Sequence, residues 1–423
     1  MTSTSPAWFD QGYPYIWLPY TQMKTAMAPT LVRETRDCRL YLSDGRVLLD
    51  GLASWWTACH GYNHPHIAES VRRQLERMPH VMFGGLVHEP ALTLARRLCT
   101  LLGAGLDRVF FTESGSVSVE VAMKMAIQYW LNQGEDRRRI VSFQGGYHGD
   151  TFGTMAVCDP QIGMHAAFRA TLPGQDVLPL PRDDESEASL DAVLRRQEGQ
   201  VAALLVEPLV QGAAGMRMHG PDVLRRLRRL ADRHGALLIF DEIFTGFGRT
   251  GTLFAFQQAG VVPDILTLSK ALSGGTLPLA ATVASQRVFQ AFWSDDPAHA
   301  LMHGPTYMGN ALACAAAHAS LDLFEREPRL EQVRAIETLL EEGLGGCREL
   351  PCVRSVRVKG AIGAVELHRA PDRAALCQAF LRAGVWVRPL ERTVYLTPAF
   401  VMPPEDVRHL TAAVRSVLAG VAP

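Results

Sequence analysis

Short apolar runs alternate with amphipathic segments through the middle of the chain. Five of these runs are bounded by polar or turn-forming residues and have the length of buried strands: 108–112, 139–143, 202–206, 236–240 and 265–268. Between them, segments 117–131 and 221–234 carry apolar residues at helical spacing. The alternation predicts βαβ units, and therefore an α/β fold in which helices cover both faces of a mostly parallel central sheet.

The pattern changes near residue 310. A helix of small residues, ALACAAAHASLDLFE, leads into a longer helical stretch, and the strand-like segments VRSVRVKGAIGAVEL and VWVRPLERTVYLTP follow. This order predicts a smaller α+β domain at the C-terminal end. The N-terminal part has a predicted strand pair of its own, LVRETRDCRLYLSDG, and we expect it to pack with that domain. We therefore predict an N-terminal segment at 1–50, a large domain at 51–325 and a small domain at 326–423.

Composition narrows the class of protein. Apolar residues make up 48% of the 423 residues and charged residues 20%, as in globular chains with a large core, and the formal net charge is −1. This balance argues against nucleic acid as the main partner. No apolar run reaches the ~18 residues of a membrane-spanning helix, and MTSTSPAWFD lacks the pattern of a secretory signal. Eight scattered cysteines without a CxxC pair are typical of reduced thiols, so we expect a cytoplasmic protein.

One loop raises the question of a metal site, because it contains His60, His64 and His66. The loop is also rich in glycine, asparagine and proline, and this loop composition explains the segment equally well. We therefore expect no bound metal.

Charged side chains follow two of the predicted strands, where a parallel sheet binds its ligands. Asp241 directly follows the run ALLIF, and Lys270 ends the segment PDILTLSK before the glycine-containing turn ALSGG. Taken alone, Asp241 is most simply explained as the cap of a turn. A lysine at a buried strand end is costly unless it is paired or used covalently. Only four of the 42 basic residues are lysines, and the other three lie in less suitable places: Lys24, Lys124 and Lys359.

Two loops add groups that suit a phosphate and an aromatic ring. Gly115 and Ser116 open a predicted helix, and helix N-termini bind anions through their free N–H groups. Tyr147 lies in the loop QGGYHGD after another predicted strand. An amine, a carboxylate, a phosphate cradle and an aromatic ring are together what pyridoxal 5'-phosphate needs from a protein. The sequence therefore predicts this cofactor, with Lys270 as its lysine and Asp241 beside its pyridine nitrogen.

Over essentially its whole length, the sequence resembles the fold-type-I, class III aminotransferases. The segments FDEIFTGFGRTG, LSKALSGG and GGYHGDT carry the resemblance. It implies that Lys270 binds the cofactor and transfers the proton, and that Asp241 contacts the pyridine nitrogen. It also implies that Tyr147 stacks on the ring, and that Gly115 and Ser116 bind the phosphate.

The segment HGPT carries a further implication of the resemblance. In that family a threonine at this place reaches the phosphate of the cofactor in the neighbouring subunit. Here the threonine is Thr306, with Pro305 beside it at the cofactor and Gly304 at the substrate. The resemblance therefore implies a homodimer with shared active sites.

Further segments are similar to one subgroup of the family. PYTQM, LASWWTACHGYNHP, ESGSVSVEVAMKMA, HGPTYMGN and WVRPL resemble enzymes that move the amino group of S-adenosylmethionine onto 7-keto-8-aminopelargonic acid in biotin synthesis. The resemblance implies that Trp55 and Trp56, with Tyr20 beside them, form an apolar wall for the long acceptor chain.

Both of these substrates carry a carboxylate. Arg388, in WVRPL, resembles the arginine that binds a carboxylate by a two-point fork. Tyr395 is expected to line the same pocket, and Arg249, in GFGRTG, to act as an auxiliary arginine.

Other functions fit the sequence less well. The nearest alternative is another class III enzyme, either a variant with lysine as donor or an ω-amino-acid:pyruvate aminotransferase. The paired tryptophans, PYTQM and HGPTYMGN argue against it. A non-catalytic regulator on this fold would need a DNA-binding module and a basic surplus. A nicotinamide-dependent oxidoreductase would need a GxGxxG turn after an early strand, which the sequence lacks.

Overall fold

A seven-stranded central sheet organises the larger part of the molecule. The computed structural model describes residues 5–103, 105–161 and 163–422. Within these residues, the strands of this sheet lie in the order β4 (Leu106–Thr112), β12 (Ala280–Ser285), β11 (Ile265–Leu268), β10 (Leu237–Asp241), β7 (Val201–Val206), β5 (Arg139–Phe143) and β6 (Asp176–Leu178). All five strands predicted from apolar runs are present, and their ends differ from the prediction by two residues at most.

The sheet is mostly parallel, as predicted. β6, β5, β7, β10 and β11 run in one direction, and β12 pairs antiparallel with both β11 and β4. The sequence pattern missed β6 and β12. β6 has only three residues, and β12 consists mainly of small residues, AATVAS, whose apolar signal is weak.

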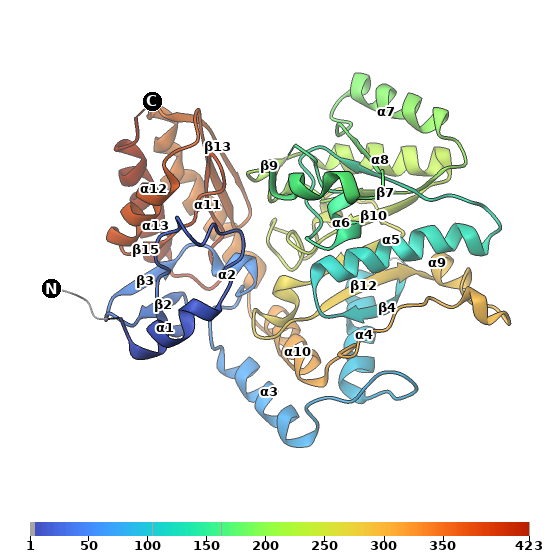
Figure 1. Cartoon of the computed structure of the whole chain (residues 1–423), viewed down its shortest axis with the longest axis horizontal. Coiled ribbons are helices and arrows are strands. Elements are labelled where there is room, and N and C mark those ends of the chain that lie inside the picture. The colour runs from blue at the N-terminus through green and yellow to red at the C-terminus, as the bar shows by residue number, and fades with distance from the viewer. Residues whose placement is uncertain (1–4, 104, 162, 423) are drawn as a thin grey trace.

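Helices bury both faces of this sheet (Figure 1). Alternate residues of β7 point to opposite faces: Leu204 packs in the core that contains α7 (Asp184–Arg196) and α8 (Pro221–His234), and Leu205 in the core that contains α5 (Gly115–Asn132). This two-sided burial explains why the strands are continuous apolar runs with no polar alternation.

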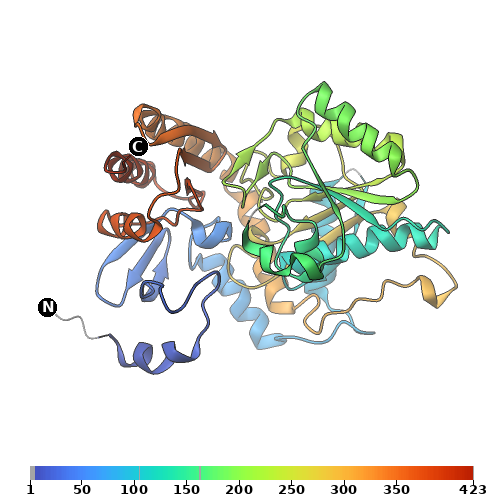
Figure 2. The same cartoon turned by 45° about the horizontal axis from the view of Figure 1, so that its top comes forward.

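Two smaller sheets lie with the C-terminal helices, on the left of Figure 1 and Figure 2. β13 (Val353–Lys359), β14 (Ile362–Leu367) and β16 (Thr393–Leu396) form one antiparallel sheet. β1 (Val32–Arg36), β2 (Arg39–Leu42) and β3 (Val47–Asp50) form the other with β15 (Val385–Trp386), which pairs with β3 in parallel. The N-terminal strands are thus joined to the C-terminal part of the chain. The predicted boundaries at residues 50 and 325 stay a prediction, and residues 1–4 lie outside the described residues.

The remaining elements connect or cover these sheets. They are α1 (Ala7–Gly12), η1 (Tyr13–Tyr15), α2 (Ala53–Trp56), α3 (Pro65–Arg77), α4 (Glu89–Leu102), α6 (Phe152–Ala156), η2 (Gly163–Thr171), β8 (Val210–Gln211), β9 (Arg217–Met218), η3 (Ala255–Gln258), η4 (Lys270–Ser273), α9 (Gln286–Gln290), η5 (Pro297–His299), α10 (Ala311–Arg326), α11 (Arg329–Gly345), η6 (Gly346–Glu349), α12 (Arg373–Arg382) and α13 (Pro404–Ala419). In the described part of the chain, no helix has both the length and the apolar character needed to cross a membrane.

Candidate active site

A cavity of about 430 Å³ opens where the carboxyl ends of β4, β5, β10 and β11 meet. This is the edge at which open α/β sheets bind ligands. Six of the residues singled out in the sequence line the cavity together: Trp56, Gly115, Ser116, Tyr147, Asp241 and Lys270. They come from segments far apart in the chain, so only the sheet topology brings them to one place.

Lys270 begins the short helix η4 directly after β11. Among the described residues, its Nζ has no hydrogen-bond or ion-pair partner, and it lies 4.7 Å from the centre of the Trp56 ring. Burial lowers the pKa of Lys270 below 10.5, and the charges of Asp241 and Glu207 only partly oppose this shift. The site therefore holds an amine that is more easily deprotonated than an ordinary lysine.

Asp241 is the last residue of β10 and is 4% exposed. His148 Nδ1 donates to its Oδ2 over 2.8 Å, whereas Oδ1 accepts from the backbone N of Ile243 at 3.1 Å and from Thr267 Oγ1 at 3.2 Å. These donors fix the orientation of the carboxylate and leave it facing the cavity. A fixed buried carboxylate of this kind suits a protonated ring nitrogen.

The start of α5 provides the predicted anion site. Ser114 caps the helix, since its Oγ accepts from the backbone N of Val117 at 3.3 Å. The first N–H groups of a helix have no carbonyl partner within it, and here they belong to residues that line the cavity. Ser116 Oγ also binds Thr151 Oγ1 at 2.9 Å, which ties this helix end to the loop after β5. Gly149 makes the approach possible, because a Cβ at this glycine would lie 2.2 Å from Ser116 Oγ.

Tyr147 and Tyr20 meet at one side of the cavity. Their hydroxyl oxygens lie 3.3 Å apart, and Tyr20 also donates to Asp150, whose Oδ1 lies 2.9 Å from His165 Nε2. Burial raises the pKa of Tyr20 to about 12 and raises that of Tyr147 further, so both phenols stay protonated. The N-terminal segment is thus hydrogen-bonded to the loop that carries Tyr147.

Aromatic rings form the wall next to Lys270. The Trp56 ring lies 4.3 Å from Phe244 and 6.2 Å from Tyr395, between ring centres. Trp55 lies 6.4 Å from Tyr20, and the Arg388 guanidinium carbon is 5.4 Å from the Trp55 ring centre. Five of the predicted substrate residues, Tyr20, Trp55, Trp56, Arg388 and Tyr395, therefore lie next to one another beside the cavity.

The two tryptophans lie on a turn whose backbone is in the left-handed conformation. Residues Ala53 to Trp56 all have positive φ, from 46° to 75°, which costs about 1–2 kcal/mol per residue outside glycine. Asp50 stabilises this turn, because its two carboxylate oxygens accept from the backbone N atoms of Leu52 and Ser54. Strain held in this way is typical of functional sites.

The structure does not bring all predicted residues to the cavity. Arg249 is 1% exposed; it donates to the carbonyls of Pro398 and Ala361 at 2.8 and 3.1 Å, and burial lowers its pKa to about 10. Arg249 thus joins its own loop to the segments that contain Ala361 and Pro398. Its predicted contact with substrate stays a prediction. Gly304, Pro305 and Thr306 lie outside the cavity of their own chain, so their predicted contact across a subunit interface also stays a prediction.

Sequence reasoning assigned no role to three further residues that line the cavity. His148 lies beside Tyr147 in QGGYHGD, and its role became visible only from its bond to Asp241. Glu207 is 5% exposed, accepts from the backbone N atoms of Tyr147 and Gly212 at 2.9 Å each, and has its pKa raised to about 7 by burial. Ile243 follows Asp241 by two residues and faces Gly115, where a Cβ would lie 2.9 Å from Ile243 Cδ1. Its position after the strand-end carboxylate was the available signal.

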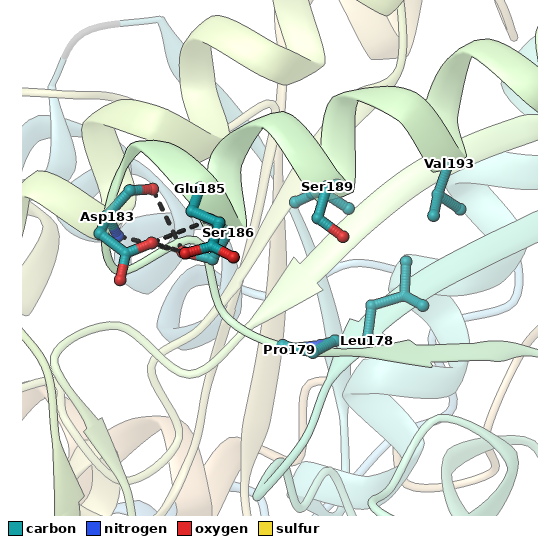
Figure 3. Close-up of a pocket in the computed structure, with 8 residues that line it drawn as sticks. Leu178, Pro179, Asp183, Glu185, Ser186, Ser189 and Val193 are labelled. Carbon is teal, nitrogen blue, oxygen red and sulfur yellow. Dashed lines mark hydrogen bonds between the residues drawn. The ribbon is translucent and has the colours of Figure 1, made fainter.

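A second hollow of about 300 Å³ lies between α7 and β6 (Figure 3). Asp183 and Ser186 cap the helix there through hydrogen bonds of 2.9 Å and 3.1 Å, and Ser189 and Val193 face Leu178. These groups satisfy one another, and none of the predicted site residues lines this hollow. The cavity beside Lys270 is therefore the candidate active site.

Comparison with known proteins identifies the class of this site. Residues 20–418 match the family described as Aminotransferase class-III, which includes every residue of the cavity. The chain belongs to the class III aminotransferase family. Members of this family transfer amino groups, so the chain is an aminotransferase, and its fold is that of the family's solved structures.

Several class III aminotransferases match this chain over nearly their whole length. The adenosylmethionine-8-amino-7-oxononanoate aminotransferase of Corynebacterium glutamicum is 42% identical, with 98% of this chain and 99% of that protein covered. The crystal structure of the enzyme of the same name from Methanocaldococcus jannaschii has a TM-score of 0.93 at 29% identity, covering 98% of both chains. An amine transaminase from an uncultivated Pseudomonas species, solved in its PLP-bound form, has a TM-score of 0.86 at 31% identity, covering 96% of this chain and 98% of that one.

Proposed function

We propose that this aminotransferase uses pyridoxal 5'-phosphate to transfer the amino group of S-adenosylmethionine to 8-amino-7-oxononanoate, also called 7-keto-8-aminopelargonic acid, in biotin biosynthesis. One observation carries the catalytic part of the proposal: the amine of Lys270, which has no polar partner in the described part of the chain, shares a cavity with the fixed carboxylate of Asp241 and the start of α5. The relatives at 42% and 29% identity, both named for this reaction, support the choice of substrates.

The residues of the cavity fit the cofactor. Lys270 offers an amine without a polar partner among the described residues, which is the group that a carbonyl cofactor needs. Gly115 and Ser116 would hold the phosphate, Asp241 the pyridine nitrogen, and Tyr147 one face of the ring. When bound, pyridoxal 5'-phosphate supplies a ring that accepts negative charge from the substrate Cα as its proton leaves.

The chain's own residues then have defined tasks. Lys270 Nζ takes the proton from the substrate Cα and returns one in the second half of the reaction, for which its lowered pKa is suited. Asp241, held by His148, stays oriented toward the ring nitrogen throughout. Trp56 covers the amine on the side of the substrate and limits access of water.

The substrate residues suit long molecules with a charged end. Both substrates carry a carboxylate, and Arg388 offers the planar fork that binds it. Burial lowers the pKa of Arg388, which marks a partly desolvated guanidinium. Trp55, Trp56 and Tyr395 give the methylene chain of the acceptor an apolar wall, and an aromatic face also attracts the sulfonium of S-adenosylmethionine.

Isotope transfer tests the donor and the acceptor together. The holoenzyme is incubated with 8-amino-7-oxononanoate and S-adenosylmethionine labelled with ¹⁵N in its α-amino group, and the diamine product is examined by mass spectrometry. We expect the label in the product, and no transfer from ¹⁵N-lysine or from an ω-amino acid at the same concentration. Transfer from lysine with failure of S-adenosylmethionine would contradict the donor. Transfer from S-adenosylmethionine to pyruvate alone would contradict the acceptor.

We further propose that the enzyme is a cytoplasmic homodimer whose active sites are shared. Support comes from the segment around HGPT, where Met302 is 79% exposed and Tyr307 is 57% exposed although both are apolar or aromatic. The predicted phosphate contact of Thr306 would bury this segment against a second subunit. Sedimentation equilibrium of the holoenzyme should give twice the chain mass, and a monomer with full activity would contradict the shared site. All eight cysteines are free, as a reducing compartment allows.

A further inference from the structure

The backbone at Lys270 has a conformation that needs support from its surroundings. Its φ is +48°, in the left-handed region that non-glycine residues rarely adopt. Gly274 and Gly275 follow with φ of +61° and +77°, so the whole turn after β11 is tightly folded. Among the described residues, Lys270 Nζ has no hydrogen-bond or ion-pair partner. The direction of the Lys270 side chain therefore depends on the backbone conformation of this turn.

A row of buried polar groups ends at this turn. Ser320 Oγ, on α10, donates to the carbonyl of Ala271, the residue after Lys270, at 3.2 Å. His60 Nε2 lies 3.1 Å from Ser320 Oγ, and Arg329 Nε donates to His60 Nδ1 at 3.0 Å. His60, Ser320 and Arg329 are at most 2% exposed. The row therefore joins α10 and the first residue of α11 to the backbone beside the active-site lysine.

Chemistry fixes the direction of every hydrogen bond in this row. A guanidinium can only donate, so His60 Nδ1 must accept from Arg329. The pKa of His60 lies well below its ordinary value because of burial and the nearby charge of Arg329, so the ring is neutral and carries its proton on Nε2. Nε2 then donates to Ser320 Oγ, whose own proton goes to Ala271. Both ring nitrogens of His60 and the hydroxyl of Ser320 thus have hydrogen-bond partners. A buried polar network whose groups are all paired in this way is rigid.

The loop that carries His60 also contacts Lys270 from the other end. Trp56, four residues earlier, lies 4.7 Å from Lys270 Nζ. Between the two contacts the packing is close: a Cβ at Gly275 would lie 2.9 Å from the backbone N of Ala58, and a Cβ at Gly274 would lie 2.7 Å from Ile67 Cδ1. In Figure 1, α2 lies between the central sheet and the C-terminal elements.

We propose that His60 and Ser320 are positioning residues, which hold the Lys270 turn in its left-handed conformation and so aim the amine into the cavity. Arg329 supports them by fixing the tautomer of His60. This inference rests on the proposed role of Lys270. It also assigns a task to His60, whose loop the sequence had left without one.

Ser320→Ala tests the proposal with the smallest change, because it removes one hydroxyl from a buried site. Thr282→Val is the matched control: Thr282 is fully buried, and its Oγ1 likewise donates to a backbone carbonyl, that of Ser118, at 2.7 Å. We expect both variants to lose similar stability toward urea. Only Ser320→Ala should lower kcat, by about 5- to 10-fold, while KM for both substrates changes by less than about twofold.

The second readout does not depend on turnover. In the apoenzyme, hydrogen exchange of peptides covering residues 269–276 should be at least about tenfold faster in Ser320→Ala than in Thr282→Val, because the Gly274 amide bonds to the same Ala271 carbonyl. His60→Gln, which keeps a donor and an acceptor, should retain more of kcat than His60→Leu.

Exchange and kcat that are the same in Ser320→Ala and Thr282→Val would overturn the proposal, and so would equal kcat values for His60→Gln and His60→Leu. These outcomes leave the role of Lys270 untouched, which Lys270→Ala tests separately. Full turnover in Lys270→Ala would overturn the proposed function as well as this inference.

Discussion

His148 and Asp241 form a buried pair, with His148 Nδ1 donating to Asp241 Oδ2 over 2.8 Å. The other ring nitrogen of His148 is buried without a partner among the described residues, and Gly146 packs against it so closely that a Cβ would lie 3.2 Å away. The ring is thus held by packing on one side and by the carboxylate on the other. This fixes the orientation of the Asp241 carboxylate, which we propose faces the ring nitrogen of the cofactor.

Asp241→Asn should remove most of the catalysis and leave the fold intact. The amide keeps the shape of the side chain and an oxygen that accepts from His148, but it no longer favours a protonated pyridine nitrogen. We expect kcat to fall at least about 100-fold, with the free energy of unfolding changed by about 1 kcal/mol or less. Steady-state kinetics and urea unfolding measure the two effects. Turnover near that of the wild type would remove Asp241 from the mechanism.

Lys270 should make the stability of the apoenzyme depend on pH. Its pKa is lowered in the folded state by burial, whereas in the unfolded chain it is near 10.5. Between these two values the unfolded chain binds more protons than the folded one, so stability gained from this group rises as pH rises toward 10.5. Lys270→Met has no amine and therefore lacks this rise in the free energy of unfolding with pH. The difference in unfolding free energy between wild type and variant should therefore shift in favour of the wild type from about pH 7.5 to about pH 9.5.

Urea unfolding of both apoenzymes at the two pH values measures this shift. Parallel pH profiles would show that the amine is not desolvated in the folded state. His148→Gln provides a control for a change elsewhere in the cavity, since it alters a buried side chain and leaves Lys270 in place.

Arg388→Ala should weaken the binding of both substrates. The donor and the acceptor use the same site in turn, and each presents a carboxylate. Loss of a charge-assisted pair in a partly buried pocket costs a few kcal/mol, which is roughly 100-fold in kcat/KM. Arg388→Lys should recover only part of this loss, because an ammonium lacks the planar fork. An effect on one substrate alone would mean that the two carboxylates bind at different places.

Trp56→Leu should act differently from Arg388→Ala. The centre of the Trp56 ring lies 4.7 Å from Lys270 Nζ and 4.3 Å from the centre of the Phe244 ring. Loss of Trp56 therefore alters both the apolar wall and the surroundings of the amine. We expect KM for the acceptor to rise and kcat to fall as well, whereas Trp55→Leu should raise KM and leave kcat nearly unchanged, since Trp55 does not line the cavity. Equal kcat in the two variants would contradict the distinction between the two tryptophans.

Subunit mixing tests the predicted role of Thr306. Thr306→Glu would place a carboxylate where the neighbouring cofactor's phosphate is expected, and it should inactivate the homodimer by repulsion. Lys270→Ala should inactivate it as well. When the two inactive proteins are mixed and reassembled, each mixed dimer has one intact site, so about a quarter of the wild-type activity should return. No recovery, with mixed dimers demonstrated by mass, would mean that Thr306 acts within its own chain.

The sequence by itself determined the architecture and the chemical groups of the site. Continuous apolar runs such as 202–206 are typical of strands buried on both faces, and their alternation with helical segments predicted the mostly parallel sheet that the structure contains. Lys270 stood out because a lysine at a buried strand end is costly without a partner, and Asp241 gained its meaning only together with the other groups that suit the cofactor. Recognisable segments around them then indicated the family before any distance was known.

Only the tertiary structure decided how these groups are supported. His148 meets Asp241 across 93 residues, and Arg329 meets His60 across 269. Local sequence carries no signal for such pairs, because hydrogen bonds between distant segments depend on how helices and strands pack. The left-handed turn at Ala53–Trp56 is of the same kind: its residues are ordinary L-amino acids, and only contacts such as those of the buried Asp50 keep them in a conformation that they would not adopt alone.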